Sequence, residues 1–154
     1  FGKDVLAQIS EEKVIQHLPE IRKFAGDRAV LRALHFFEEN KRVEAEVAAL
    51  KEGRFNDFLE NITASGNSSW KWLQNCYVPG SEVQGITSAL ALTELFINEK
   101  GCGACRVHGG GFAGTIQAFV PNDLLKDYKS IMESIFGEGT CYVLYIRPVG
   151  GTEI

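Results

Sequence analysis

Several features that would point to whole classes of protein are missing from this chain. Its 154 residues hold 16 basic and 20 acidic side chains, so the net charge of −4 offers no excess of positive charge to attract a nucleic-acid backbone. No apolar run reaches the roughly 18 residues that a membrane-spanning helix needs, and the N-terminal segment lacks the pattern of a secretory signal. We therefore expect a soluble, cytoplasmic protein that binds neither nucleic acid nor membrane.

Cysteine is scarce, and its spacing argues against a metal site or a disulfide framework. Cys102 and Cys105 form a Cys-x-x-Cys pair with His108 close behind, but neither Cys76 nor Cys141 has a neighbouring ligand that would complete a zinc site. The pair leads into a glycine-rich stretch, whereas a thioredoxin-like motif lies where a strand meets a helix. The sequence predicts reduced thiols and no metal.

The first part of the chain has the periodicity of helices. Ser10, followed by two glutamates, indicates a helix start, and Pro19 is expected to limit or kink that helix. Gly26 then predicts a stop and Asp27 a new cap. Residues 28–50 contain neither glycine nor proline and predict one long helix.

Two further helices are expected before the chain changes character. One begins near Asn56, and the polar residues 65–69 are expected to interrupt it. The other is opened by a capping-box pair, Ser81 and Gln84, and ends at Gly101.

The last third of the chain is richer in strand-forming residues. Short β-rich runs at residues 104–108, 115–120 and 140–146 predict three strands. A helix capped by Asn122 and ending near Gly137 separates the second strand from the third. Helices followed by a small, mostly antiparallel sheet indicate an α+β fold, and the length suits a single domain over residues 1–154.

The glycine run at residues 109–114 is the most unusual stretch, and it also satisfies the loose dinucleotide pattern G-x-G-x-x-G. That pattern functions where the glycines open a helix, whereas residues 115–120 read as a strand. No Gly-Lys-Ser or Gly-Lys-Thr ends the run, so it is not a Walker loop. Two explanations remain: a hairpin connection that needs positive φ angles, or a backbone surface that another segment or a phosphate approaches closely.

Residues 106–121 closely resemble the C-terminal glycine motif of galactokinases, which belong to the family shared with homoserine, mevalonate and phosphomevalonate kinases. Residues 32–53 resemble the long helix of galactokinases, and residues 68–81 are similar in layout, so the resemblance covers residues 28–148. The usual family form has glycine where this chain has Ala113. The resemblance implies the C-terminal half of a larger sugar kinase, with a ferredoxin-like fold of the kinase C-terminal type.

The resemblance also implies a site. The glycine loop would support the nucleotide phosphates through Gly109, Gly110, Gly111, Phe112 and Gly114. Phosphate or interdomain contacts are expected from Arg106, His108, Arg32 and His35. The last two lie on one helix face with Arg28, Glu39 and Arg42, which is either a solvated stripe or a polar junction with the missing half.

The family's own phosphate loop and the segment with its catalytic acid are absent from this sequence, so we expect no catalytic residue here and no activity from this chain alone. The whole enzyme would use ATP and Mg²⁺ to phosphorylate the C1 hydroxyl of galactose, and the partner of this chain would be its own N-terminal catalytic half. The alternatives are a stand-alone α+β binding or regulatory module and a dinucleotide-binding fragment.

Overall fold

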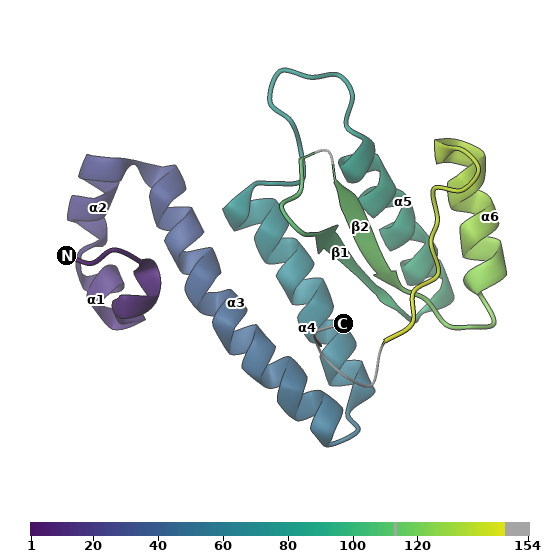
Figure 1. Cartoon of the computed structure of the whole chain (residues 1–154), viewed down its shortest axis with the longest axis horizontal. Helices are drawn as coiled ribbons and strands as arrows, with labels where there is room; N and C mark the ends of the chain where they lie inside the picture. The colour runs from purple at the N-terminus through teal and green to yellow at the C-terminus, as the bar shows by residue number, and fades with distance from the viewer. Residues whose placement is uncertain (113, 147–154) are drawn as a thin grey trace, which may run out of the picture. The chain divides into compact units, whose positions relative to one another are not determined.

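Figure 1 shows the computed structural model of the chain, which describes residues 1–112 and 114–146. The chain divides into two compact units, one over residues 1–119 and one from residue 120 onward. In chain order the first unit contains η1 (Leu6–Gln8), α1 (Glu11–Gln16), α2 (Leu18–Ala25), α3 (Asp27–Lys51), α4 (Phe55–Ser68), η2 (Ser69–Leu73), α5 (Gly85–Lys100), β1 (Ala104–His108) and β2 (Thr115–Phe119). The second unit contains α6 (Leu125–Phe136). Helices precede a small antiparallel sheet, which confirms the α+β class.

The N-terminal helices begin and end near the predicted residues, with two differences. The Ser10 hydroxyl accepts a hydrogen bond from the Lys13 amide at 3.3 Å and caps α1 as expected. The first helix ends at Gln16, before Pro19, but Pro19 does not kink a helix; it lies in the first turn of α2, where its missing N–H is not needed. Asp27 does not cap α3, because its carboxylate pairs with Arg22 while Gly26, at φ +81°, holds the cap position.

The predicted interruption at residues 65–69 is wrong. Helix α4 continues to Ser68 and passes directly into η2, a short π-helix. Within this stretch Gly66 faces β1, since a Cβ atom on it would lie 2.9 Å from the carbonyl oxygen of Cys105. The Ser65 and Ser68 side chains instead bond Glu39 and His35 of α3. Packing on both sides therefore outweighs the tendency of these residues to form turns.

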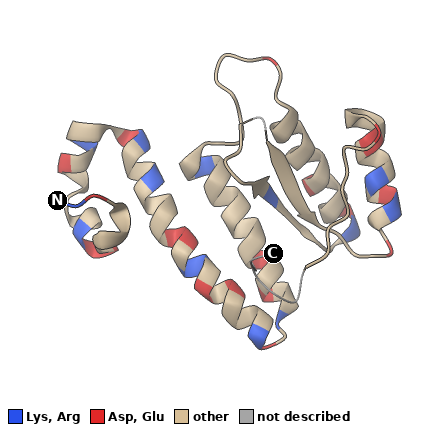
Figure 2. Ribbon diagram, in the orientation of Figure 1, with Lys and Arg blue, Asp and Glu red and all other residues tan. Residues whose placement is uncertain are grey.

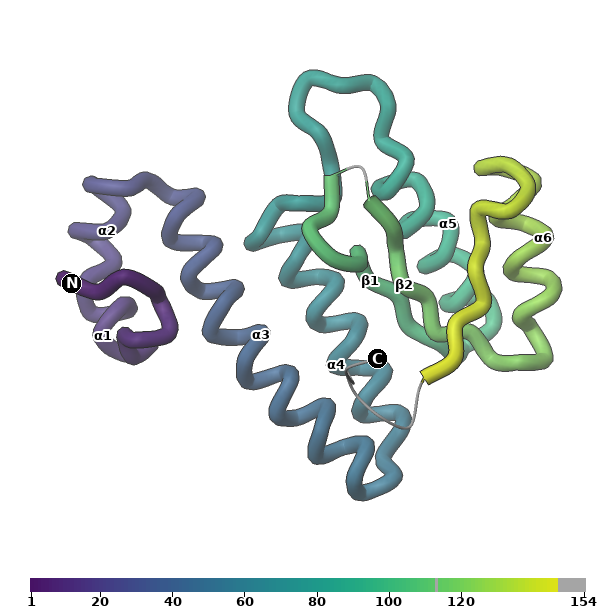
Figure 3. The backbone as a smooth tube through the Cα atoms, in the orientation of Figure 1, coloured from purple at the N-terminus to yellow at the C-terminus, as the bar shows by residue number. Residues whose placement is uncertain are grey.

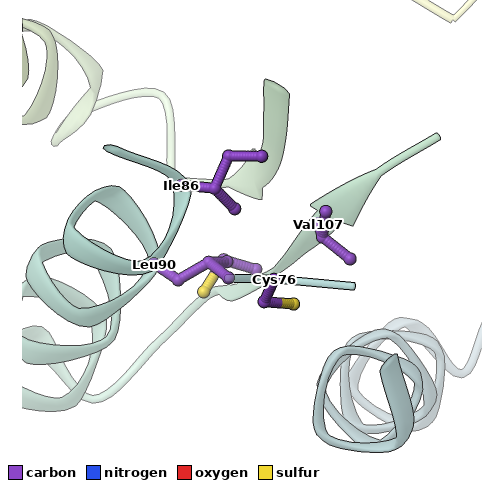
Figure 4. Close-up of a cluster of buried hydrophobic side chains, with 5 residues drawn as sticks. Cys76, Ile86, Leu90 and Val107 are labelled. Carbon is purple, nitrogen blue, oxygen red and sulfur yellow. The ribbon is translucent and has the colours of Figure 1, made fainter. Parts of the chain in front are cut away.

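The two strands form an antiparallel hairpin in which Ala104 pairs with Phe119 and His108 with Thr115. A two-stranded hairpin is marginal in water unless helices cover it. Helices α4 and α5 both contact β1. One buried cluster joins β1 to α5 and the segment before it (Figure 4), and it consists of Cys76, Ile86, Leu90, Cys105 and Val107. A second joins β1 to α3 and α4 and consists of Ala49, Phe58, Ile62 and Ala104.

The capping box predicted for α5 does not form. Gln84 takes the cap position, but its side chain turns back to the preceding loop. Its amide accepts from the Val78 N–H at 3.0 Å and donates to the carbonyl oxygens of Val78 and Ser81 at 2.8 and 2.7 Å. Gln84 therefore closes residues 78–84 into an ordered loop. The helix ends at Gly101 as predicted, with φ +72°.

In the second unit, α6 ends at Gly137 as predicted, although Leu124 rather than Asn122 precedes its first turn. The third strand predicted over residues 140–146 is wrong, because these residues form neither helix nor strand. Strand-forming side chains give a strand only where another strand supplies hydrogen bonds. Here Tyr142, Leu144, Tyr145 and Ile146 are 80–90% exposed.

Candidate functional site: the glycine loop

The glycine loop, residues 109–114, connects β1 to β2, and Ala113 within it lies outside the described residues. Gly109 and Gly111 have φ angles of +64° and +78°, and Gly114 donates its N–H to the Gly111 carbonyl at 3.2 Å. A strand follows the loop, so the glycines do not open a helix as a dinucleotide fingerprint would. The hairpin connection therefore explains some of the glycines, because it needs positive φ angles at Gly109 and Gly111.

Close approach by another segment is the second reason for the glycines in this loop. The Asn75 carbonyl oxygen accepts a hydrogen bond from the Phe112 N–H at 2.7 Å, and the Asn75 side-chain nitrogen donates to the Gly110 carbonyl at 3.2 Å. Figure 3 shows the segment before α5 passing beside the turn between the strands. A Cβ atom on Gly111 would lie 2.1 Å from the Asn75 carbonyl oxygen, so only glycine fits there.

The conformation on both sides of this contact is unusual. Gln74, which ends η2, and Phe112 are the two non-glycine residues with positive φ in residues 1–112 and 114–146, at +58° and +60°. Such a conformation costs about 1–2 kcal/mol per residue and persists where the surroundings fix it. Asn75 is 3% exposed and adjoins both of them. Two strained residues therefore meet at one buried asparagine.

Asn75 was not among the site residues predicted from the sequence. A single asparagine after a tryptophan-rich stretch carries no pattern of its own. The available signal was indirect: several glycines in succession indicate that some backbone approaches closely, without indicating which one.

The structure separates the two polar residues predicted on β1. His108 is exposed at the end of the strand, directly before the glycines. Arg106 instead extends toward α3, where its guanidinium lies 3.7 Å from the Glu39 carboxylate, and its Nε donates to the Val107 carbonyl at 3.2 Å. Of the two, His108 is the side chain that lies beside the glycine loop.

The polar side chains predicted on one face of α3 also have two different environments. Figure 2 shows charges of both signs along this helix, and Arg28 and Arg32 at its start are exposed. Further along, a polar cluster joins α3 to α4 and β1, and its members are His35, Glu39, Arg42, Ser65, Ser68 and Arg106. The Glu39 carboxylate is its centre: it accepts from Arg42 and from the Ser65 hydroxyl, each at 2.5 Å. This part of the stripe is an internal contact.

His35 belongs to this polar cluster, with its Nδ1 2.9 Å from the Ser68 hydroxyl. Burial lowers the pKa of the His35 imidazole below its ordinary value of 6.5. The nearby Glu39 carboxylate raises that pKa, while Arg42 and Arg106 lower it further. His35 is therefore mostly neutral at pH 7, which suits a hydrogen-bond partner.

Two cysteines, Cys76 in the segment before α5 and Cys105 in β1, are buried and unreactive in character. Burial raises the pKa of the Cys76 thiol to about 11 and that of the Cys105 thiol to about 12. Both remain protonated at neutral pH, and a protonated thiol is a poor nucleophile and metal ligand. Among the residues that the structure describes, no three His, Cys, Asp or Glu side chains gather where a metal could be held. Nor does any helix in the described part combine the length and apolar character that crossing a membrane requires.

Together these features define an α+β domain whose strand hairpin presents a glycine loop fixed against the segment before α5. The chain is similar to curated galactokinases. That of Glaesserella parasuis serovar 5 is 27% identical over 140 residues, which are 91% of this chain and 34% of that protein. That of Staphylococcus carnosus is 34% identical over 116 residues, 75% of this chain and 28% of that protein. The resemblance to galactokinases that the motifs indicated is therefore confirmed.

The coverage of these matches is uneven. The galactokinase of Limosilactobacillus reuteri is 29% identical over 75% of this chain but over 27% of its own length. The chain thus spans about a third of the length of the curated relatives it matches. No family model matches it. No solved structure matches it significantly.

Proposed function

We propose that this chain is the C-terminal part of a galactokinase-like sugar kinase and that its glycine loop supports the phosphates of ATP. The complete enzyme would be cytoplasmic and would transfer the γ-phosphoryl group, with Mg²⁺, to the C1 hydroxyl of galactose. Its N-terminal catalytic half would be the partner of this chain. The observation that carries the proposal is a strained, fixed glycine loop in a chain similar to galactokinases over 91% of its length.

The chemistry of phosphoryl transfer suits such a loop. Catalysis of this reaction is mainly positioning and stabilisation of charge, which backbone amides supply without any side chain that could be misplaced. Gly109 and Gly111 are left-handed, whereas Gly110 between them is not. Alternation of this kind turns successive N–H groups toward one side and favours an anion there. Gly109 and Gly110 are exposed, so a phosphate could reach them.

The side chains around the loop have supporting roles in this proposal. His108 would contact a phosphate and Arg32 the catalytic half, and both side chains are exposed. Arg106 and His35 act within the polar cluster, where Arg106 pairs with Glu39. Mg²⁺ would be held by the nucleotide and by the catalytic half. We assign no catalytic residue to this chain and expect no activity from it alone.

Gly110 offers a direct test, because a Cβ atom there would meet nothing within 4 Å in the folded chain. Gly110→Ala should leave the thermal unfolding temperature unchanged and obstruct only a bound phosphate. In the complete gene product, assayed by galactose-dependent ADP release, we expect kcat/KM for ATP to fall about 10- to 100-fold. Gly85→Ala is the matched control, since its Cβ would also meet nothing.

Two results would contradict the proposal: a complete gene product that releases no ADP with galactose, or a Gly110→Ala variant with unchanged kinetics. Calorimetry on the 154-residue chain addresses the alternatives. Binding of ATP or galactose by this part alone should be millimolar or weaker. Micromolar binding of a nicotinamide or flavin dinucleotide would favour the dinucleotide-binding alternative.

A further inference from the structure

We infer that Asn75 is a positioning residue for the glycine loop: by bonding the Phe112 amide and the Gly110 carbonyl, it holds residues 110–112 in the conformation that directs the Gly110 and Gly111 amides toward a phosphate. The phosphate part of this inference rests on the proposed function. The contact between Asn75 and the loop does not, and it can be measured in the chain by itself.

Asn75 contacts the loop through both an acceptor and a donor. Asn75 accepts through its backbone carbonyl from the Phe112 N–H and donates through its side-chain amide to the Gly110 carbonyl. One residue thus binds the loop on both sides of Gly111, with a donor and an acceptor. Because Gly111 has no Cβ, the Asn75 carbonyl also fits against the backbone between these two bonds. The loop cannot slide along Asn75 without breaking both.

Backbone strain lies on both sides of the contact with Asn75. In the described chain the non-glycine residues with positive φ are Gln74 and Phe112, one adjacent to Asn75 in sequence and the other bonded to it. Strain of this kind persists where neighbouring contacts determine the backbone, and it is frequent at functional sites. Donors that are fixed before a ligand arrives need no reorganisation when charge develops.

Asn75 is itself anchored by its neighbours in the chain. It is buried and followed by Cys76, which belongs to the core cluster on α5. The Cys76 carbonyl accepts from the Thr87 hydroxyl at 2.8 Å, and the Gln74 N–H donates to the Ser69 carbonyl at 2.8 Å. The segment is therefore tied to α5 on one side and to η2 on the other. The position of the loop therefore depends on the positions of α5 and η2, because Asn75 contacts the loop and its neighbours are bonded to those helices.

Hydrogen exchange in the 154-residue chain tests the contact, because the Phe112 amide is protected by its bond to Asn75. In Asn75→Ala the side-chain bond to Gly110 is lost, and we expect Phe112 to exchange about tenfold faster under native conditions. Thr93→Val is the control, since it removes another buried donor, the hydroxyl that bonds the Ala89 carbonyl at 2.7 Å, away from the loop. It should leave Phe112 exchange unchanged.

Asn75→Asp tests whether the side-chain hydrogen bond, and not only the size of the side chain, holds the loop. At neutral pH its carboxylate cannot donate to the Gly110 carbonyl, whereas a protonated carboxyl can. After correction for intrinsic exchange, the protection of Phe112 in this variant should return as the pH falls through the pKa of the new carboxyl. The wild-type chain should show no such recovery.

Kinetics of the complete gene product then test the role of the loop toward a phosphate separately from its contact with Asn75. Asn75→Ala should lower kcat about tenfold and leave KM for galactose unchanged, as expected when an interaction made in the transition state is weakened. Unchanged Phe112 exchange in both Asn75 variants would overturn the inference, whatever the activity. Altered exchange with unchanged kinetics in an active kinase would overturn its phosphate part. A wild-type product without kinase activity would overturn the proposed function, while the exchange data still decide whether Asn75 holds the loop.

Discussion

His35 shows what burial does to a single titratable side chain in this protein. Its ring enters the contact between α3 and α4 and lies beside Ser68, with Glu39, Arg42 and Arg106 as its charged neighbours. Because burial is the main influence on it, the neutral imidazole is favoured in the folded state. The unfolded chain then binds a proton more readily than the folded one.

Stability should therefore depend on pH through His35. The pKa of His35 lies below 6.5 in the folded chain and near 6.5 in the unfolded chain, so its contribution is complete above pH 6.5 and is lost as the pH falls through the lower, folded value. We expect the free energy of unfolding to fall more steeply below pH 6.5 in the wild type than in His35→Gln, whose amide does not titrate. Urea denaturation at a series of pH values measures this, and parallel curves would contradict it.

Among the single residues of the candidate site, the sequence predicted the glycines of the loop but not the asparagine that contacts them. The glycines were identifiable because several in succession weaken a sheet and need a reason. Their partner was not, because Asn75 lies 35 residues before Gly110 and reaches it through tertiary packing. Arg106 and His108 were correctly placed on one strand, but their different partners depend on where α3 lies.

At the scale of elements, α4 is the instructive case. The polar, small residues 65–69 at its end favour a turn when read locally, yet they form helix because β1 lies against Gly66 and α3 bonds Ser65 and Ser68. Positions of helices and strands with strong periodicity, such as α3, α5 and α6, were predictable from the sequence. The extension of α4 into η2 and the loop closed by Gln84 were not, since both depend on contacts between elements.

Two helical glycines should respond oppositely to the same substitution. In Gly66→Ala the new methyl group would lie 2.9 Å from the Cys105 carbonyl oxygen, so the helix or strand must move, at a cost of about 1–3 kcal/mol. In Gly85→Ala the methyl group meets nothing, and the better helix former should stabilise the chain by about 0.5 kcal/mol. Chemical denaturation of both variants checks this, and equal effects would show that α4 does not press on β1.

At the scale of the whole molecule, the exposed apolar segment Tyr142–Ile146 stands out. It contains only aromatic, β-branched and leucine residues, and four of its five side chains are at least 80% exposed. A strand-forming, uncharged run without proline is prone to pair with copies of itself when it has no partner. The same property that made the sequence predict a strand here makes the segment a site of association.

The 154-residue chain should therefore self-associate through this segment. Leu144→Lys places a charge in its middle and should reduce light scattering at high protein concentration severalfold, as charged gatekeeper residues do. Leu95→Lys is the matched control, because it makes the same change at another exposed leucine, which lies in α5 and not in such a run. Equal effects of the two variants would assign the behaviour to net charge alone.

The π-helix η2 has a consequence for how this protein tolerates changes in length. Its wide turn, with Gln74 bonded to Ser69, takes in a residue more than an α-helical turn would. Removing one residue between Ser69 and Leu73 would convert the wide turn into an α-helical one, which covers nearly the same rotation about the helix axis with one residue fewer. The chain that follows should keep its direction, and Asn75 should still meet Phe112. A one-residue deletion in η2 should therefore displace the chain beyond it less than the same deletion in the regular part of α4.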